Sequence, residues 1–178
     1  MVVHGFLSCR ILHPVKPAYR TIAALLFALY GFVLLKVTLF RTSVTLFDVE
    51  FSERNGYITS MTTAWQRANF IPFHSVWYYL ISQQEPIEVG MVNVFGNILL
   101  FIPFGVLLPL VWRKARSFKN TTLIIAVTSL FFEVFQMLLV IGNFDIDDVL
   151  LNTMGGMLGY ALFALGVQVS TARNRPLL

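Results

Sequence analysis

Three aspartates stand directly before an apolar run near the end of the sequence. The stretch FDIDDVLLNTMGGMLGY, residues 144–160, contains Asp145, Asp147 and Asp148, with Asn152 one helical turn beyond the last of them. Clustered carboxylates beside an amide can bind a hard cation such as Mg²⁺ or Ca²⁺. They can equally receive a cationic ligand or an arginine, and the spacing is not that of a calcium-binding loop. The three aspartates are therefore candidate metal or ligand-binding residues.

A purely structural role is the alternative for one of these acids. An Asp at the start of a helix accepts hydrogen bonds from free N–H groups and suits the helix dipole, so Asp145 could cap the helix that follows. A cap needs one carboxylate, and the sequence supplies three. We therefore expect at least one of Asp147 and Asp148 to do something else.

Three apolar segments each carry a polar pair at helical spacing. The pairs are Asn93 with Asn97, Glu133 with Gln136, and Asp148 with Asn152. Residues three or four apart share one face of a helix.

Glu133 is the most unusual of these polar residues, because an ionisable side chain at the centre of a membrane helix costs about 2.5–3.5 kcal/mol on insertion scales. Glu133 either belongs to a functional site or holds helices together, and Lys36 either pairs with it or extends to the membrane interface. The asparagines have packing hydrogen bonds as their structural alternative.

The composition places these residues in a membrane protein. The chain has 178 residues, of which 57% are hydrophobic and 12% charged, and its mean hydropathy is +0.73. A soluble domain is about 25% charged. The basic residues form no soluble face for nucleic acid, and the single cysteine, Cys9, excludes a disulfide framework.

The expected fold is all-α, a single domain over 1–178 with four transmembrane helices. A membrane span needs roughly 20 apolar residues, and four segments qualify at about 20–40, 91–112, 121–141 and 149–169. The first is read as an uncleaved helix rather than a signal peptide. Gly155 and Gly159 have the spacing that lets two helices approach closely.

Charges between the spans predict the topology. Lys and Arg occupy residues 1–19, 113–120 and 170–178, whereas the segments 41–90 and 142–148 are acidic. Basic residues stay on the cytoplasmic side. Both termini are therefore expected inside, and the two acidic segments outside. The polar pairs then all lie toward the outer leaflet.

The segment 41–90 is long enough to hold further structure. TLFDVEF, residues 45–51, alternates in the manner of an extended stretch. Farther along, Trp77, Tyr78 and Tyr79 are aromatic residues of the kind found at the headgroup level, so we expect an interfacial or re-entrant helix around 74–84.

Four motifs in this order resemble the VanZ-like family of bacterial membrane proteins. They are NFIPF (69–73), NVFGNILLFIPFGVLLP (93–109), EVFQ (133–136) and the aspartate stretch, so the resemblance covers about 69–160. It implies a bacterial cytoplasmic membrane protein of the cell envelope. The polar signature of the family falls on Asn69, Asn93, Asn97, Glu133, Gln136, Asp145, Asp147, Asp148 and Asn152.

The founding member of that family is associated with resistance to the lipoglycopeptide teicoplanin, without the altered cell-wall termini of vancomycin-resistance enzymes. Many members carry an arginine just before the aspartates, where this chain has Gly142 and Asn143. The association with teicoplanin resistance implies a partner such as a membrane lipid, a lipid-linked envelope precursor or a lipoglycopeptide.

Three functions follow from these patterns. The first is a non-enzymatic protein that binds such a lipid or drug at the outer leaflet. The second is an envelope-modifying enzyme, with Glu133 and Asp148 as candidate catalytic residues. Glu133 would be the general base, and Asp147 or Asp148 would hold a metal or the substrate. No arginine or histidine is expected in the cluster, which argues against phosphate chemistry without a metal. The third is a transporter subunit, which would have to oligomerise.

Overall fold

The computed structural model describes residues 17–40, 61–81 and 86–173, which are almost entirely helical. Four helices are long and apolar enough to cross a membrane: α2 (Pro17–Phe40), α5 (Ile87–Val111), α6 (Phe118–Leu138) and α7 (Ile146–Arg173). One isolated bridge apart, the described residues contain no β-structure. The all-α, four-span expectation is thereby confirmed, while the extended stretch expected at 45–51 lies outside the described residues.

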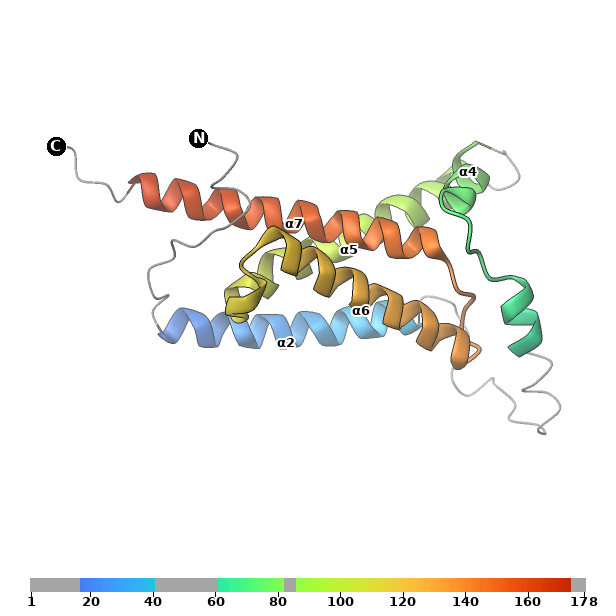
Figure 1. The fold of residues 1–178 in the computed structure, drawn as a ribbon, viewed down its shortest axis with the longest axis horizontal. Helices are drawn as coiled ribbons and strands as arrows, with labels where there is room; N and C mark the ends of the chain where they lie inside the picture. Colours follow the sequence, from blue (N-terminus) through green and yellow to red (C-terminus); the bar gives the residue numbers. More distant parts are fainter. Residues whose placement is uncertain (1–16, 41–60, 82–85, 174–178) are drawn as a thin grey trace.

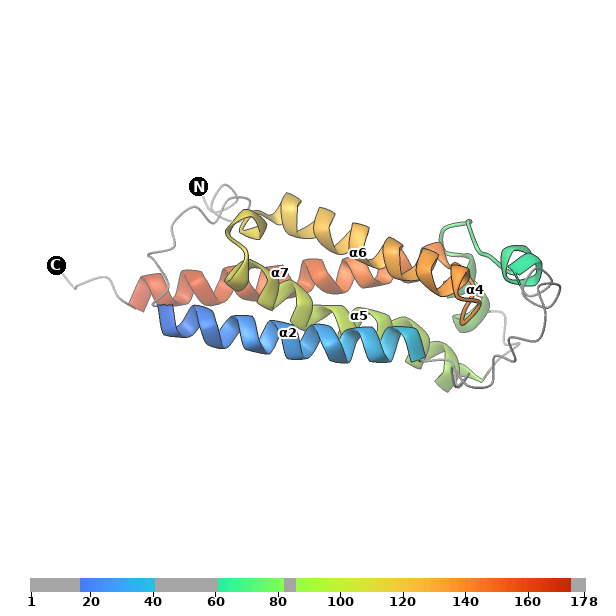
Figure 2. The same cartoon turned by 90° about the horizontal axis from the view of Figure 1, so that it is seen from below.

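The four helices run along one another as an elongated bundle (Figures 1 and 2). The most extensive packing joins α5 to α7; α6 also packs on α7, and α2 on α5. The 3-10 turn η1 (Arg113–Ala115) lies at one end, where α2 also begins and α7 ends. We call this the η1 end. The opposite, α4 end holds the short helix α4 (His74–Leu80) and the turn between α6 and α7.

Local backbone chemistry sets the two ends of α6. Both ends lie three residues earlier in the sequence than those of the predicted span, 121–141. Ser117 caps its first turn, because its side chain accepts a hydrogen bond from the Asn120 N–H over 3.2 Å. Val140 has a φ of 56°, in the left-handed region, which ends the helical path just beyond Leu138.

Glycines let α5 and α7 touch backbone to backbone. A Cβ atom built on Gly155 would lie 2.1 Å from the main-chain oxygen of Ile98, and one on Gly159 would lie 2.1 Å from that of Ile102. Such separations are far below any real contact, so only glycine fits. The close approach predicted from the spacing of these two glycines is confirmed.

Aromatic and aliphatic side chains fill the middle of the bundle. Phe101 and Phe104 of α5 are buried with Leu34 of α2, and with Ile125 and Phe132 of α6. Large apolar side chains are instead exposed along the outer faces, as suits a bundle surrounded by lipid. They include Leu25, Leu29, Val92, Leu99, Leu123, Val127, Leu158 and Leu162.

The segment before α5 crosses the α4 end of the bundle. Residues 61–66 are helical, and α4 follows after a turn. The helix expected around 74–84 is therefore present, and its regular part ends at Leu80. Between these two helices, the main chain of Asn69 pairs with the segment that precedes α7: its N–H donates to the Phe144 oxygen over 2.8 Å, and its own oxygen accepts from Ile146 N–H over 3.0 Å.

Candidate functional site

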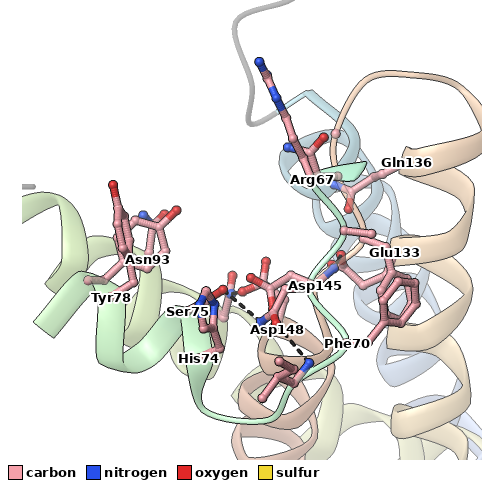
Figure 3. A pocket seen from close by; sticks show the side chains of 18 of the residues that line it. Arg67, Phe70, His74, Ser75, Tyr78, Asn93, Glu133, Gln136, Asp145 and Asp148 are labelled. Atoms are coloured by element: carbon pink, nitrogen blue, oxygen red, sulfur yellow. Dashed lines mark hydrogen bonds between the residues drawn. The ribbon is translucent and has the colours of Figure 1, made fainter. Parts of the chain in front are cut away.

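A cavity of about 690 Å³ opens at the α4 end, between α5, α6, α7 and the segment 66–79. We call it the polar cavity. Figure 3 shows side chains from all of these elements around it. Eight of the nine residues singled out from the sequence line it, namely Asn69, Asn93, Asn97, Glu133, Gln136, Asp145, Asp148 and Asn152. The structure thus gathers residues as far apart as 69 and 152 at one end of the bundle.

Asp147 is the exception, since it does not line the polar cavity. Its side chain is 1% exposed, and its two oxygens accept hydrogen bonds from three main-chain N–H groups. The donors are Phe73, Ser75 at 2.8 Å and Val76 at 3.2 Å. Asp147 therefore fixes the start of α4 against the start of α7, and its role is to position the segment that lines the cavity.

Asp145 caps α7, as the sequence suggested. Its Oδ1 accepts the Asp147 N–H over 2.9 Å, the bond expected of an N-cap residue. The same oxygen accepts a hydrogen bond of 2.9 Å from the Asn69 side chain. Its own N–H donates to Oε2 of Glu133 over 3.1 Å, so α6 and α7 are joined through this residue.

Asn69 organises the turn that leads into α4. Besides its main-chain pairing with the α7 approach, its Nδ2 donates to the Ser75 hydroxyl over 3.0 Å. Its Oδ1 accepts the Ile71 N–H, also over 3.0 Å. The turn then passes through Phe73, whose φ of 67° is uncommon for a residue with a side chain. Asn69 thus holds the wall of the polar cavity in place through several bonds at once.

The carboxylates and amides of α5, α6 and α7 meet within the bundle. The Asn97 amide donates to Asp148, and the Gln136 amide donates to the main-chain oxygen of Thr38 on α2. Glu133 and Asn97 are each 3% exposed. Lys36, the partner considered for Glu133, is exposed on α2, and a pairing between the two stays a prediction.

Asn152 is both buried and incompletely hydrogen bonded. Its Nδ2 donates to the fully buried Ser129 hydroxyl over 2.8 Å. Its Oδ1 accepts no hydrogen bond from the part of the chain that the structure describes, although the side chain is only 3% exposed. Buried carbonyl groups normally have a donor, so this oxygen marks a position where one is missing.

Several lining residues were not foreseen, and two of them correct an expectation. Arg67 and His74 both line the polar cavity, so the expectation of no arginine or histidine in the cluster was wrong. Ser75 and Tyr78 line it as well. Figure 3 places Arg67 at the edge, with its guanidinium extending away from Asp145 and Asp148. These lining residues lie close to Asn69 in the sequence, and that closeness was the signal that could have placed them in the site.

The candidate metal ligands Asp145, Asp147 and Asp148 do not point to a common centre. Asp145 caps a helix, Asp147 binds the α4 segment and Asp148 faces Asn97. Within the described ranges, no group of three or more His, Cys, Asp or Glu side chains is arranged to hold a metal ion.

Two comparisons with known proteins found matches to this chain. A sequence model of the VanZ/LLP1 family matches residues 27–167. Protein VanZ of Enterococcus faecium is 40% identical over 73 residues, which are 41% of this chain and 45% of that protein. The aligned segment thus spans less than half the length of this relative. No solved structure matches the chain.

Proposed function

Because this chain belongs to the VanZ/LLP1 family, we propose that it is a cell-envelope protein whose polar cavity binds an amphiphilic envelope ligand. One observation carries the proposal: eight polar residues from four parts of the chain line a single cavity. Seven of them were predicted from their types and spacing, and Asn69 was predicted from the family resemblance. A bundle that only needed to fold could fill this space with apolar side chains, at little cost in stability. The ligand is an envelope lipid, a lipid-linked precursor or a lipoglycopeptide.

The membrane orientation that we propose puts the polar cavity at the outer face of the bacterial cytoplasmic membrane. Arg113, Lys114 and Lys119 are exposed at the η1 end, where α2 also begins and α7 ends. Basic residues of this kind favour the cytoplasmic side. Both chain termini are then inside, and the carboxylates at the α4 end face outward.

The neighbourhood of the cavity suits a ligand with a polar head and an acyl chain. Phe70 and Ile71 line it and are 53% and 66% exposed, so their apolar surfaces continue from the lining to the outside of the bundle. Phe73 and Trp77 are exposed beside them, with 67% and 60% of their surface accessible. Such residues favour the boundary between headgroups and acyl chains. A polar head could enter the cavity while its chain stays in lipid.

The biological consequence that we propose is reduced susceptibility to teicoplanin-type lipoglycopeptides. The protein would bind either the drug itself or the envelope lipid on which the drug acts. The family resemblance supports this role. Arg67 lies at the cavity edge of this chain and could serve where other members carry an arginine before the aspartates.

An envelope-modifying enzyme is the second candidate. In this reading Glu133 is the general base. The presence of Arg67 and His74 in the lining favours it, because these residues can stabilise developing negative charge or transfer a proton. An enzyme would convert a purified envelope lipid into a new product, whereas a binding protein would bind the lipid and leave it unchanged.

The test is the inhibitory concentration of teicoplanin in a susceptible Gram-positive host that expresses the wild type or Glu133→Gln. Glu88→Gln is the matched control, because Glu88 is exposed in the first turn of α5. At equal membrane levels, the wild type and the control should protect, and Glu133→Gln should not. Equal protection by all three would show that Glu133 only packs helices. Protection by none would overturn the resistance role.

A further inference from the structure

The polar cavity is rich in hydrogen-bond acceptors that carry negative charge. Three carboxylates line it, those of Glu133, Asp145 and Asp148. The guanidinium of Arg67 is at the edge and extends away from two of them (Figure 3). A cavity lined in this way attracts a positive group and disfavours a phosphate or a carboxylate.

A second observation points to the same chemistry. Asn152 is 3% exposed and lines the polar cavity, yet its Oδ1 accepts no hydrogen bond within the described part of the chain. Its Nδ2 is already committed to Ser129, so the amide presents an acceptor and lacks a donor. Asn152 follows Asp148 by one helical turn, so both lie on the same face of α7. The missing component is therefore a donor near Asp148.

We propose that the polar cavity recognises a primary ammonium group, which inserts between Glu133, Asp148 and Asn152. This inference deepens the proposed function and rests on it, because it names the chemical group by which the amphiphile is held. An ammonium has three N–H donors and no acceptor, which complements two carboxylates and one amide oxygen.

The energetics require this complementarity. A carboxylate as buried as that of Glu133 is unfavourable unless it is paired or neutralised. A carboxylate can accept about four hydrogen bonds in all. Hydrogen bonds from the Asp145 N–H and the Asn97 amide hold Glu133 and Asp148 in the lining of the cavity, where a ligand can reach them. Hydrogen bonds between charged partners are roughly twice as strong as neutral ones.

Aromatic rings line the polar cavity as well. Tyr78 and Tyr79 of α4 both line the cavity, with their ring centroids 5.4 Å apart in an edge-to-face arrangement. The face of an aromatic ring attracts a cation. Tyr78 lies on the same side of the cavity as His74, across from Glu133 (Figure 3).

An ammonium group of this kind could be carried by a phospholipid headgroup or by the antibiotic. The experiment compares both sources in amine and acetylated form. Calorimetric titrations of the purified full-length protein in detergent would use short-chain phosphatidylethanolamine, teicoplanin and the N-acetyl derivative of each. We expect acetylation to weaken binding by about tenfold or more, because it removes the charge and two donors. If only phosphatidylethanolamine binds more tightly than its N-acetyl derivative, the lipid headgroup is the source of the ammonium group. If only teicoplanin does so, the drug is the source.

Variants show whether binding occurs at the proposed position. Glu133→Gln and Asp148→Asn should each weaken binding of the amine by about tenfold, while Glu88→Gln, exposed on α5, should leave it unchanged. Asp148→Asn keeps an oxygen that can accept the Asn97 bond, so it tests the charge even if Glu133→Gln does not fold.

Two results would overturn the inference. One leaves the proposed binding function intact, and the other overturns it as well. Equal affinity for amine and acetylated forms, or wild-type affinity in both cavity variants, would exclude ammonium recognition and leave amphiphile binding intact. If none of the four compounds binds, ammonium recognition and the proposed binding function both fail.

Discussion

Helices α5 and α7 meet in two contrasting ways along their length. In the middle of the bundle, Gly155 and Gly159 of α7 touch the backbone of α5 at Ile98 and Ile102, with no room for a methyl group. At the α4 end, Asp148 of α7 is hydrogen bonded to Asn97 of α5, and both side chains line a cavity of about 690 Å³. The same two helices thus touch through their backbones in one region and through polar side chains that line a cavity in the other.

The difference shows that residue type sets the role of each part of α7: glycines pack the bundle, and polar residues line the cavity. Both α7 pairs have a spacing of four residues, so each forms one face of a helical turn. Glycines let the backbones meet, which fixes the distance between the two helices. Polar side chains at the end of the same contact then hold the cavity open and leave one acceptor unsatisfied. The packed region supports the cavity, which is where we place function.

The largest expected effect comes from breaking the packed region. Gly155→Ala would place a Cβ atom 2.1 Å from the Ile98 oxygen, so the helices must separate. Overpacking of this kind costs about 1–3 kcal/mol. The melting temperature in detergent should fall. The control is Gly166→Ala on the same helix, where nothing lies within 4 Å of the added carbon, and it should be neutral or stabilising. Equal melting of both variants would show that the close contact is absent in solution.

A smaller and local effect is expected at the wall of the polar cavity. Asp147→Ala removes the acceptor of three main-chain N–H groups, at Phe73, Ser75 and Val76. Because Phe73 is exposed and Ser75 and Val76 are half-buried, water can replace much of the lost bonding, so the total cost should be about 1 kcal/mol. Hydrogen exchange at these three amides should accelerate, while the amides of α7 around Gly155 should stay protected. Unchanged exchange at 73–76 would mean that Asp147 does not hold this segment.

The smallest expected effect on stability concerns the buried pair of the cavity floor. Replacing both partners, in Ser129→Ala with Asn152→Leu, removes the bond between them and the unsatisfied Oδ1 together. When both polar partners are replaced by apolar groups, stability changes little, here by about 1 kcal/mol or less.

The same double variant should nevertheless lose teicoplanin protection, because the cavity loses the Asn152 side chain and its unsatisfied acceptor. Melting temperature and inhibitory concentration, measured on one preparation and one strain, separate these outcomes. A strong loss of stability would make the pair part of the packed region instead.

Much of this arrangement could be predicted from sequence alone. Helical periodicity and apolar length gave the four spans. Spacings of three or four residues put each polar pair on one helix face, and the helical rise with the predicted orientation put Asn97, Glu133 and Asn152 toward one end. These signals are local, since each depends on residues within one helix. Helix ends were less predictable, because a left-handed residue such as Val140 depends on the turn that follows it.

The role of the segment before α5 could not be predicted in the same way. Arg67 and His74 enter the site only because Asn69 pairs with Asp145, across 76 positions in the sequence. The different roles of Asp145, Asp147 and Asp148 could not be predicted either, because they also depend on contacts between distant parts of the chain. One turn of helix points them in different directions, and their partners come from remote parts of the chain.

Cysteine labelling of intact cells tests most directly whether the polar cavity opens to the outside. Cys9 is the only cysteine, so a Cys9→Ser background can carry Asn93→Cys in the cavity lining or Lys119→Cys at the η1 end. A membrane-impermeant maleimide should label the first in intact cells, and the second only after permeabilisation. Labelling of Lys119→Cys from outside, with Asn93→Cys protected until the membrane is opened, would contradict an outward-facing cavity.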